Sequence, residues 1–289
     1  MSWAAHELEC YVIQRHVRLR ISYLAVLAGT LLPDVATKLW VYGFSVGGHH
    51  IGASDPARFH RGWPGLGFTH SLTFGIIAAA VVMWRTSDSA WGLGVLVGQW
   101  AHALTDVNDS VGTMLFFPFS TEHFSTGMWA YAATEGRHGD AAAYYSSLGG
   151  VWDVAWLAVA LLSWRVLTAD YFRTKVAPAD GRWDRLQRRF GLPDVVVVAV
   201  YRAYFLYGAC RIVAWTVWAH AVERSPWDLS WGGPWFVERI DAGATSIESL
   251  AVATGIGTIG LALTALVSWR LCGAPWRRAG DGADGRSGG

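Results

Sequence analysis

The sequence has little charge, few cysteines and no excess of either charge sign. Asp, Glu, Lys and Arg make up 16% of the 289 residues, whereas soluble domains contain about 25%. Lys and Arg number 23 against 22 Asp and Glu, so the basic excess typical of nucleic-acid-binding proteins is missing and no nucleic-acid partner is expected. The three cysteines are scattered and odd in number, which excludes a disulfide framework and a Cys-x-x-Cys metal site.

Apolar residues, by contrast, are abundant: they account for 53% of the chain, which also contains 18 Trp. A helix needs about 20 apolar residues to cross the hydrocarbon core of a membrane. We therefore expect an all-α, polytopic membrane helix bundle of about six transmembrane helices, with a short helix at the N-terminus as an option. The six candidate spans are 21–42, 72–84, 90–105, 151–167, 195–222 and 247–271.

The distribution of positive charge predicts the orientation of these spans. Fifteen of the 23 Lys and Arg residues lie on the side of residues 1–20, Arg85, 165–194 and the C-terminus, and that side is cytoplasmic by the positive-inside rule. The basic stretch 173–194 reads as an interfacial helix on that leaflet. Residues 1–272 are then one transmembrane domain with accessory helices in 151–272, and 273–289 form a flexible tail.

The residues able to do chemistry gather at the other, extracytoplasmic face. Asp34 lies toward the outer half of the first span, His70 opens the second span, and His102 and Asp106 close the third. The outer loops add His60, Arg61, Glu122 and His123. Because the spans were chosen without reference to these residues, their convergence favours a site for zinc or another divalent metal.

His102 and Asp106 form the tightest unit of this group. Their i, i+4 spacing puts an imidazole and a carboxylate on one helix face, where they can bind one metal or two adjacent ones. Alternatively, Asp106 orients His102 or caps the helix end. Asp34 also needs a partner inside an apolar run, and either Lys38 one turn later or a metal would serve.

Several stretches resemble a known family. These are TLLPDVATK, the His-Arg-Gly at 60–62, FTHSLTFG and HALTD, all within residues 1–125. Together they look like the YdjM-like bacterial membrane-bound metal-dependent hydrolases, whose ligand pattern is similar to that of zinc-dependent phospholipase C. The resemblance implies a multi-pass protein of the bacterial inner membrane. It also implies the metal ligands His6, Asp34, His60, His70, His102 and Asp106.

Two of these ligands depart from a simple match. His6 falls on the cytoplasmic side of the predicted topology, unless residues 6–18 form a short helix that pairs with the first span as a hairpin. His60 and Arg61 are separated from Thr69 by WPGLGF, where the family has almost no spacer. Thr69 and Ser71 are expected to cap the following helix or to fix the imidazoles.

The expected activity is hydrolysis by a metal-activated water, with one to three zinc ions. Asp34 or Asp106 would bridge two metal ions, and Arg61 would hold a phosphate oxygen. Glu122 and His123 would relay a proton or add a ligand. The substrate is expected to be a membrane lipid or lipid-linked molecule cleaved at a phosphoester bond. An amide or ester hydrolase on a lipid, and a metal or proton transporter using the same His and Asp cluster, are the alternatives.

Arg211 stands apart from this cluster in the sequence. It lies deep in span 195–222, which contains no acidic residue near it. A carboxylate on another helix, such as Asp153 or Glu248, would neutralise it, or else it would bind an anionic lipid headgroup.

Overall fold

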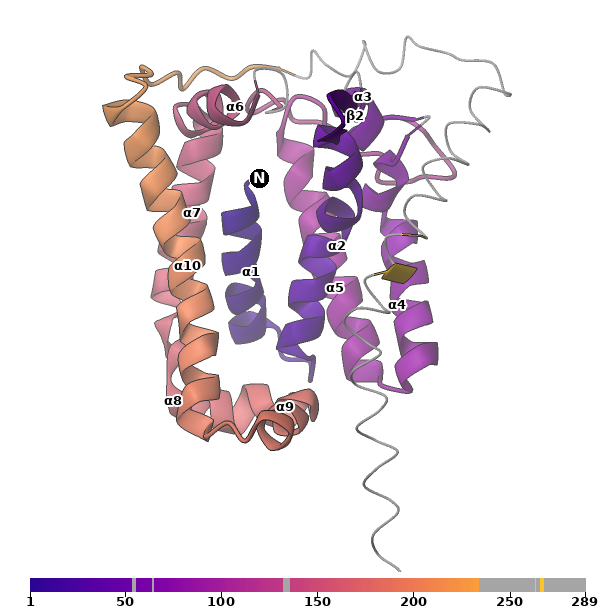
Figure 1. Cartoon of the computed structure of the whole chain (residues 1–289), viewed down its shortest axis with the longest axis vertical. Coiled ribbons are helices and arrows are strands. Elements are labelled where there is room, and N and C mark those ends of the chain that lie inside the picture. Colours follow the sequence, from indigo (N-terminus) through magenta and orange to yellow (C-terminus); the bar gives the residue numbers. More distant parts are fainter. Residues whose placement is uncertain (54–55, 64, 132–135, 234–262, 264–265, 268–289) are drawn as a thin grey trace, which may run out of the picture.

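The computed structural model describes residues 1–233 except 54–55, 64 and 132–135, together with 263 and 266–267. The longer helices run roughly side by side, and α9 lies across one end of the bundle (Figure 1). These helices are α1 (Trp3–His16), α2 (Tyr23–Tyr42), α4 (Leu72–Thr86), α5 (Ser89–Thr105), α7 (Leu148–Leu162), α9 (Arg182–Phe190) and α10 (Asp194–Ala221). The expectation of an all-α protein holds for these residues, whose strands are the short β1 (Phe44–Val46) and β2 (His49–Ile51).

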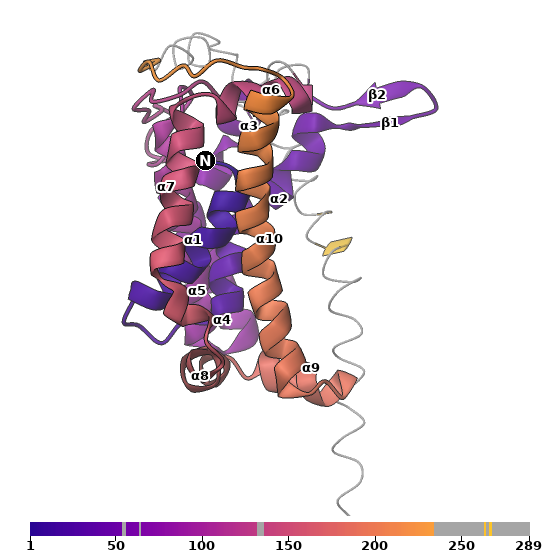
Figure 2. The same ribbon diagram turned by 90° about the vertical axis from the view of Figure 1, so that its left-hand side faces the viewer.

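Shorter helical segments connect the long ones. They are α3 (Pro56–Arg61), η1 (Gly67–His70), η2 (Asp106–Asn108), α6 (Gly136–Tyr145) and, near α9, η3 (Trp164–Leu167), α8 (Ala169–Tyr171), η4 (Phe172–Val176) and η5 (Ala177–Ala179). The antiparallel hairpin of β1 and β2 projects from the bundle at the end that carries α3 and α6 (Figure 2). That end is opposite to α9. Its short segments α3, η1 and η2 contain His60, His70 and Asp106, three of the predicted metal ligands.

Polar side chains define where several helices begin. Ser2, Ser71, Asp88 and Ser147 are the N-caps of α1, α4, α5 and α7, and each side chain accepts a hydrogen bond from a backbone N–H of the first turn. Such caps satisfy donors that the helix itself leaves unpaired. The expectation that Ser71 caps a helix is confirmed, and this cap places His70 directly at the entrance of α4.

The α2 and α5 helices pack closely through glycines. A Cβ atom added to Gly29 of α2 would collide with the backbone of Val95, and one added to Gly98 of α5 would collide with the carbonyl of Val26. Gly94 and Gly98 form a Gly-x-x-x-Gly pair, a spacing that lets two helix backbones approach inside membranes. This contact brings the carboxyl-terminal part of α2, with Asp34, next to that of α5, with His102.

The N-terminal helix pairs with α2 as a hairpin. Residues 17–22 join the two helices, and α1 contacts α2, α7 and α10. The N-terminus therefore lies toward the end of the bundle that carries α3 and α6 (Figures 1 and 2). The predicted topology put all of residues 1–20 on the same side as 165–194, the stretch that contains α9, and this prediction is wrong for the first residues of α1. The alternative, a hairpin that brings His6 to the cluster, is present.

Six transmembrane helices are not present among the described residues, and this prediction is corrected. Only α10, with 28 residues, is both long and apolar enough to cross a membrane. The apolar helices Tyr23–Val35, Leu72–Thr86 and Leu148–Leu162 are shorter, and a 15-residue helix spans only about 22 Å of a roughly 30 Å hydrocarbon core. The predicted spans 72–84 and 90–105 were already shorter than the roughly 20 residues that a crossing needs, and the helices found there have 15 and 17 residues.

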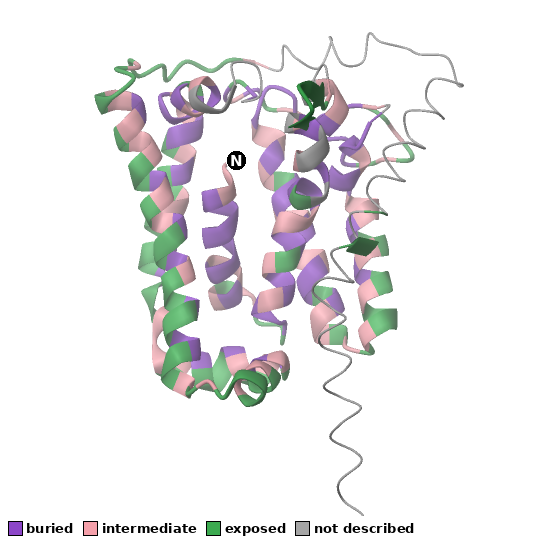
Figure 3. Ribbon diagram, in the orientation of Figure 1, coloured by how far each residue is buried: buried purple, intermediate pink, exposed green. Residues whose placement is uncertain are grey.

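The predicted span 195–222 corresponds to α10, whereas the predicted span 247–271 lies outside the described residues except for three positions, and so does the tail 273–289. Many apolar side chains on the outer faces of the bundle are exposed (Figure 3). They include Ile77 of α4, Leu162 of α7 and Leu206 of α10. A large exposed apolar surface is typical of contact with a membrane or a partner protein.

Candidate metal centre

The six predicted metal ligands come from different elements and meet in the structure. His6 lies on α1, Asp34 on α2, His60 on α3 and His70 at the end of η1, while His102 and Asp106 end α5 and begin η2. All six are buried: each imidazole has an exposed fraction of 0%, and the carboxylates of Asp34 and Asp106 have 4% and 1%. Four buried imidazoles and two buried carboxylates in one place require a compensating partner.

Asp34 lies at one side of the group. Its Oδ1 atom is 3.1 Å from Nε2 of His60, 3.8 Å from Nε2 of His70 and 3.9 Å from Nε2 of His102. Three imidazole nitrogens from three elements thus face one carboxylate oxygen.

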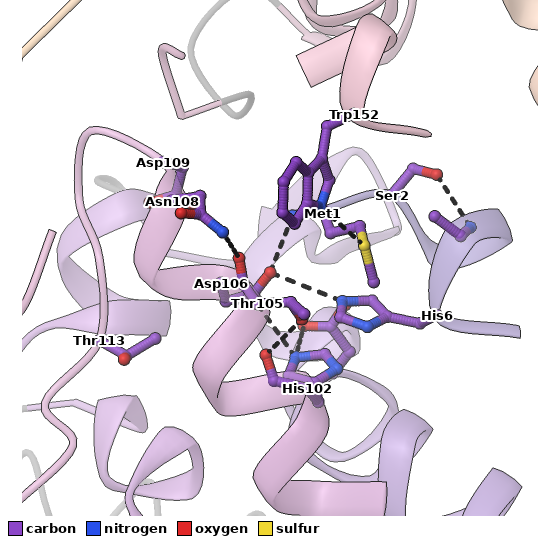
Figure 4. A network of polar contacts seen from close by, with 12 residues as sticks. Met1, Ser2, His6, His102, Thr105, Asp106, Asn108, Asp109, Thr113 and Trp152 are labelled. Atoms are coloured by element: carbon purple, nitrogen blue, oxygen red, sulfur yellow. Dashed lines mark hydrogen bonds and ion pairs between the residues drawn. The ribbon is translucent and has the colours of Figure 1, made fainter. Parts of the chain in front are cut away.

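Asp106 lies at the other side, as Figure 4 shows. Its Oδ2 atom is 3.1 Å from Nε2 of His102 and 3.9 Å from Nε2 of His70, and its Oδ1 atom is 3.5 Å from Nε2 of His6. The ring of His6 stacks on that of His102 with a centroid distance of 4.0 Å. His102 and His70 therefore stand between the two carboxylates.

The atoms that face one another lack hydrogen bonds. Nε2 of His6, His60, His70 and His102 and Oδ1 of Asp34 are all buried without a hydrogen-bond partner among the described residues. An unsatisfied buried polar atom costs about 1–3 kcal/mol, so five of them converging on one small volume indicate a missing ligand. Lone pairs of imidazole and carboxylate are the donors that zinc and related divalent ions bind.

The other nitrogen of each imidazole is held by the protein. Nδ1 of His102 donates to the carbonyl of Thr30 at 2.6 Å, and Nδ1 of His6 lies 3.3 Å from a carboxylate oxygen of Glu9. Nδ1 of His60 contacts the hydroxyl of Tyr131 at 2.8 Å. Such outer contacts orient the rings of metal-binding histidines and select the tautomer with a free Nε2.

The contact of His70 is made by Thr69, as the sequence predicted. The Thr69 hydroxyl donates to the carbonyl of Leu66 at 2.8 Å and so accepts from Nδ1 of His70 at 3.1 Å. Burial, followed by the positive charge of Arg61, holds the pKa of His70 well below its usual range. Burial also lowers the pKa of His60 to about 4, against the pull of Asp34. Both rings are therefore neutral near pH 7, which is the form that binds metals.

Two sets of possible ligands overlap in this cluster. His6, His102 and Asp106 form one set, and Asp34, His70 and His102 form the other; within each set the ligand atoms lie within 4.8 Å of one another. Because Nε2 of His102 has a single lone pair and belongs to both sets, only one of the two sets could use it for an ion at a time.

Cationic groups surround the outer edges of the two carboxylates. Arg61, which is buried, lies 2.8 Å from Oδ2 of Asp106 and 3.3 Å from Oδ2 of Asp109. The amine of Met1 lies 2.8 Å from Oδ1 of Asp106. Nζ of Lys38 lies 3.6 Å from Oδ2 of Asp34, which also accepts from the indole of Trp3. Of the two partners predicted for Asp34, Lys38 thus pairs with Oδ2, while Oδ1 faces the imidazoles.

Glu122 and His123 lie outside this cluster. Glu122 is exposed, and Nδ1 of His123 donates to the carbonyl of Val111 at 2.9 Å. Their expected role as a proton relay stays a prediction.

Several residues of the site were not predicted from the sequence. Tyr131, Thr30 and Glu9 orient imidazoles, and Asp109 pairs with Arg61. Glu9 follows His6 by three residues and could have been found from its helical spacing. Tyr131 is 71 residues from His60, so no local signal connects them.

A cavity of about 550 Å³ opens beside the cluster and reaches α10. Asp34, Lys38, Arg61 and Asp109 line its metal-centre side, and Trp129, Tyr131, Tyr144, Arg211 and Trp215 are among its other lining residues. The partner of Arg211 among the described residues is Glu7 of α1, at 2.9 Å. Asp153, one of the two acidic residues predicted for it, accepts instead from Tyr144 and Ser2, and Glu248, the other, lies outside the described residues.

The comparisons agree with the resemblance seen in the sequence. The family described as YdjM inner membrane protein matches residues 5–172, which is more than half of the chain and includes all six clustered ligands. No curated protein and no solved structure matches the chain.

Proposed function

Because this chain belongs to the family of YdjM inner membrane proteins, we propose that it is a membrane-embedded metal-dependent hydrolase that cleaves a phosphoester bond of a lipid or lipid-linked substrate. The observation that carries the proposal is the convergence of five buried, unsatisfied ligand atoms from Asp34 and four histidines. Structural histidines in a protein core normally find hydrogen-bond partners for both nitrogens, whereas these find one each.

The donor set agrees with zinc. Four imidazoles and two carboxylates are borderline and hard ligands, and the group contains no thiolate among the described residues. The two overlapping sets, which share His102, favour one ion, within the expected range of one to three. Manganese or iron would fit the same donors.

A bound ion would supply Lewis acidity, which polarises a phosphoester oxygen and makes water nucleophilic near neutral pH. The protein would supply position and charge. Hydrolysis forms a bond from the water oxygen to phosphorus and breaks the bond to the leaving alcohol, which takes up a proton. Asp106, within reach of His6 and His102, is the group placed to accept the proton of the water.

Arg61 is the residue proposed to hold the phosphate. Its guanidinium lies at the boundary between the carboxylates and the cavity, 5.3 Å from the ring centroid of Tyr131. Nη2 is used by Asp106 and Asp109, and Nη1 donates to the carbonyl of Gly112 at 3.4 Å. Nε is buried without a partner among the described residues and is the N–H proposed to donate to an anion.

The hydrolase is favoured over a metal or proton transporter by the surroundings of Gln99. A transport path would need polar groups that continue from the cluster toward the α9 end. In the predicted spans that correspond to α4 and α5, Gln99 is the polar residue that could continue such a path. Its amide nitrogen donates to the carbonyls of Thr69 and Ser71 at 3.0 Å each. Gln99 thus ties η1 to α5 and does not extend a path.

The metal centre is proposed to face the extracytoplasmic side of the inner membrane. Support comes from α9, whose four arginines (Arg182, Arg185, Arg188 and Arg189) lie at the opposite end of the bundle. In intact cells, a membrane-impermeant maleimide should label a cysteine at position 230 and not one at position 188, each on an otherwise cysteine-free chain. The reverse labelling would contradict the orientation.

Metal content and hydrolysis test the proposed function. The purified wild-type protein should contain stoichiometric zinc and release phosphate or a phosphorylated headgroup from mixed micelles that contain phospholipids. The H102A/D106A double variant should lose both. His50→Ala, a change at an exposed histidine of β2, is the matched control and should keep both. Metal-free wild-type protein would refute the metal centre, and a zinc-loaded but inactive one would refute the hydrolase.

A further inference from the structure

The cavity beside the metal centre has two chemically different ends. At one end Asp34, Arg61 and Asp109 line it, next to the orphaned imidazole nitrogens. At the other end it is lined by Arg211 and Trp215 of α10 and by Tyr144 of α6. A volume of about 550 Å³ lies within the range of small-molecule binding pockets.

Arg211 brings a positive charge to the α10 end. Its hydrogen bonds to Glu7 leave from Nη1 alone, at 2.9 and 3.1 Å from the two carboxylate oxygens. The guanidinium lies 5.0 Å from the ring centroid of Tyr207, and 27% of the side chain is exposed. A guanidinium carries five N–H donors in a planar fork. Nη2 and Nε of Arg211 make no hydrogen bond to the described residues, and we expect them to serve a ligand that enters the cavity.

The surroundings of Arg211 are aromatic. Trp215 follows it by one helical turn, and Trp129 and Tyr144, both buried, line the same cavity and stack edge to face with a centroid distance of 5.9 Å. Such rings accept the apolar part of a ligand, since their faces and edges bury well against hydrocarbon. A cation among aromatic rings is suited to an anionic amphiphile and poorly suited to a small hydrophilic solute.

We propose that Arg211 is a specificity-determining residue, which binds a second anionic group of an amphiphilic substrate at the α10 end of the cavity. Arg61 holds the phosphate at the metal centre, and Trp215 and its aromatic neighbours hold the apolar part. The inference rests on the proposed hydrolase, whose substrate class it narrows to lipids with an anionic group that reaches α10. Arg211 and Trp215 lie outside residues 5–172, the part matched by the family.

Substitution of Glu7, the partner of Arg211, distinguishes a structural ion pair from a binding site by the direction in which anion affinity changes. In a purely structural pair, Glu7 and Arg211 satisfy each other, and removal of either one only lowers stability. In a binding site, Glu7 competes with the ligand for the guanidinium. Glu7→Gln should then preserve or tighten anion binding, while Arg211→Gln should weaken it.

The proposal is tested by measuring the binding of a lipid probe to the purified, zinc-loaded full-length protein in detergent. The probe is a dioctanoyl lipid with two phosphonate groups in its headgroup, whose phosphorus–carbon bonds resist hydrolysis, and the affinity is measured by calorimetry. Arg211→Gln should weaken binding about tenfold to a hundredfold, as expected for charge-assisted hydrogen bonds. Binding of neutral dioctanoylglycerol should stay unchanged.

Each other outcome overturns the proposal. Equal affinity of wild type and Arg211→Gln for the phosphonate means that Arg211 is structural. An equal, Arg211-dependent affinity for inorganic phosphate means that the site takes a water-soluble anion instead of a lipid. If Arg211→Gln unfolds, the E7Q/R211Q double variant, which removes both charges, replaces it. Because the probe is not turned over, failure of hydrolysis would refute the proposed function and leave this result standing.

Discussion

Nε2 of His102 lies 3.1 Å from Oδ2 of Asp106, one helical turn further along the chain. The same ring donates from Nδ1 to the carbonyl of Thr30 on α2, so His102 is fixed from two helices at once. Because Asp34 follows Thr30 by one turn, this contact sets the spacing of the two carboxylates. His102 belongs to both sets of possible ligands because its ring is held between these two carboxylates.

Asp106→Asn should abolish high-affinity zinc binding without unfolding the protein. The change removes a ligand charge, so the zinc affinity should fall by more than the roughly 10- to 100-fold typical of outer contacts. Arg61 keeps Asp109 as a partner at 3.3 Å, which avoids an unpaired buried cation. Titration against a chromophoric chelator measures the affinity. Asp194→Asn, at an exposed ion pair with Arg173, should bind zinc normally; wild-type affinity in Asp106→Asn would contradict the assignment.

Tyr131→Phe should weaken zinc binding about 10- to 100-fold while the fold is retained. It deletes only the hydroxyl that contacts Nδ1 of His60 at 2.8 Å and keeps the ring beside Arg61. The loss follows because outer contacts orient the ligand ring and favour its metal-binding tautomer. Tyr171→Phe is the matched control, since it removes a hydroxyl that donates to the carbonyl of Gln14, near α8. If both variants bind zinc equally, His60 is not held for a metal.

Part of the candidate ligand set could be predicted from local patterns in the sequence, whereas His6 and His60 came from the family resemblance. The His102 and Asp106 spacing, the carboxylate after Pro33 and the histidine at a helix entrance are each visible within a few residues. The structure brings these stretches together through the packing of α2 against α5. Tyr131 and Asp109 remained unpredicted, because their partners His60 and Arg61 are about 50 to 70 residues distant.

The membrane topology was predicted less well than the site. Hydropathy identifies an apolar segment and does not report how much of it is one helix, so a predicted span can continue past the residue at which the helix ends. Leu148–Leu162 is such a case, since the helix ends at Ser163 and η3 follows. The position of His6 was recovered from the resemblance, and charge counting alone assigned it to the wrong end.

The stability of the metal-free protein should decline in acid because His60 is buried as a neutral ring. Burial lowers its pKa to about 4 from the ordinary 6.5, so the unfolded chain binds more protons between these values. Stability is therefore complete above pH 6.5 and decreases as the pH falls toward 4, by about 3 kcal/mol from this residue. Thermal melting in detergent with a chelator, at pH 7.5 and pH 4.5, measures the decrease. His60→Gln should show a smaller decrease than wild type; an equal one would mean that His60 does not contribute.

Gly98→Ala should weaken zinc binding at least about tenfold although it alters no ligand. A Cβ atom at this position would collide with the carbonyl of Val26 and approach the amide of Thr30. It would therefore push α2 away from α5 one turn before His102. Alanine favours helix over glycine by about 1 kcal/mol, so a loss would reflect the displaced helices and not a weaker α5. The control is Gly181→Ala, where a Cβ meets open space. Zinc titration should show weaker binding, and thermal melting a lower melting temperature, in Gly98→Ala and not in Gly181→Ala. Tight zinc binding by Gly98→Ala would mean that the close approach of α2 and α5 does not set the geometry of the centre.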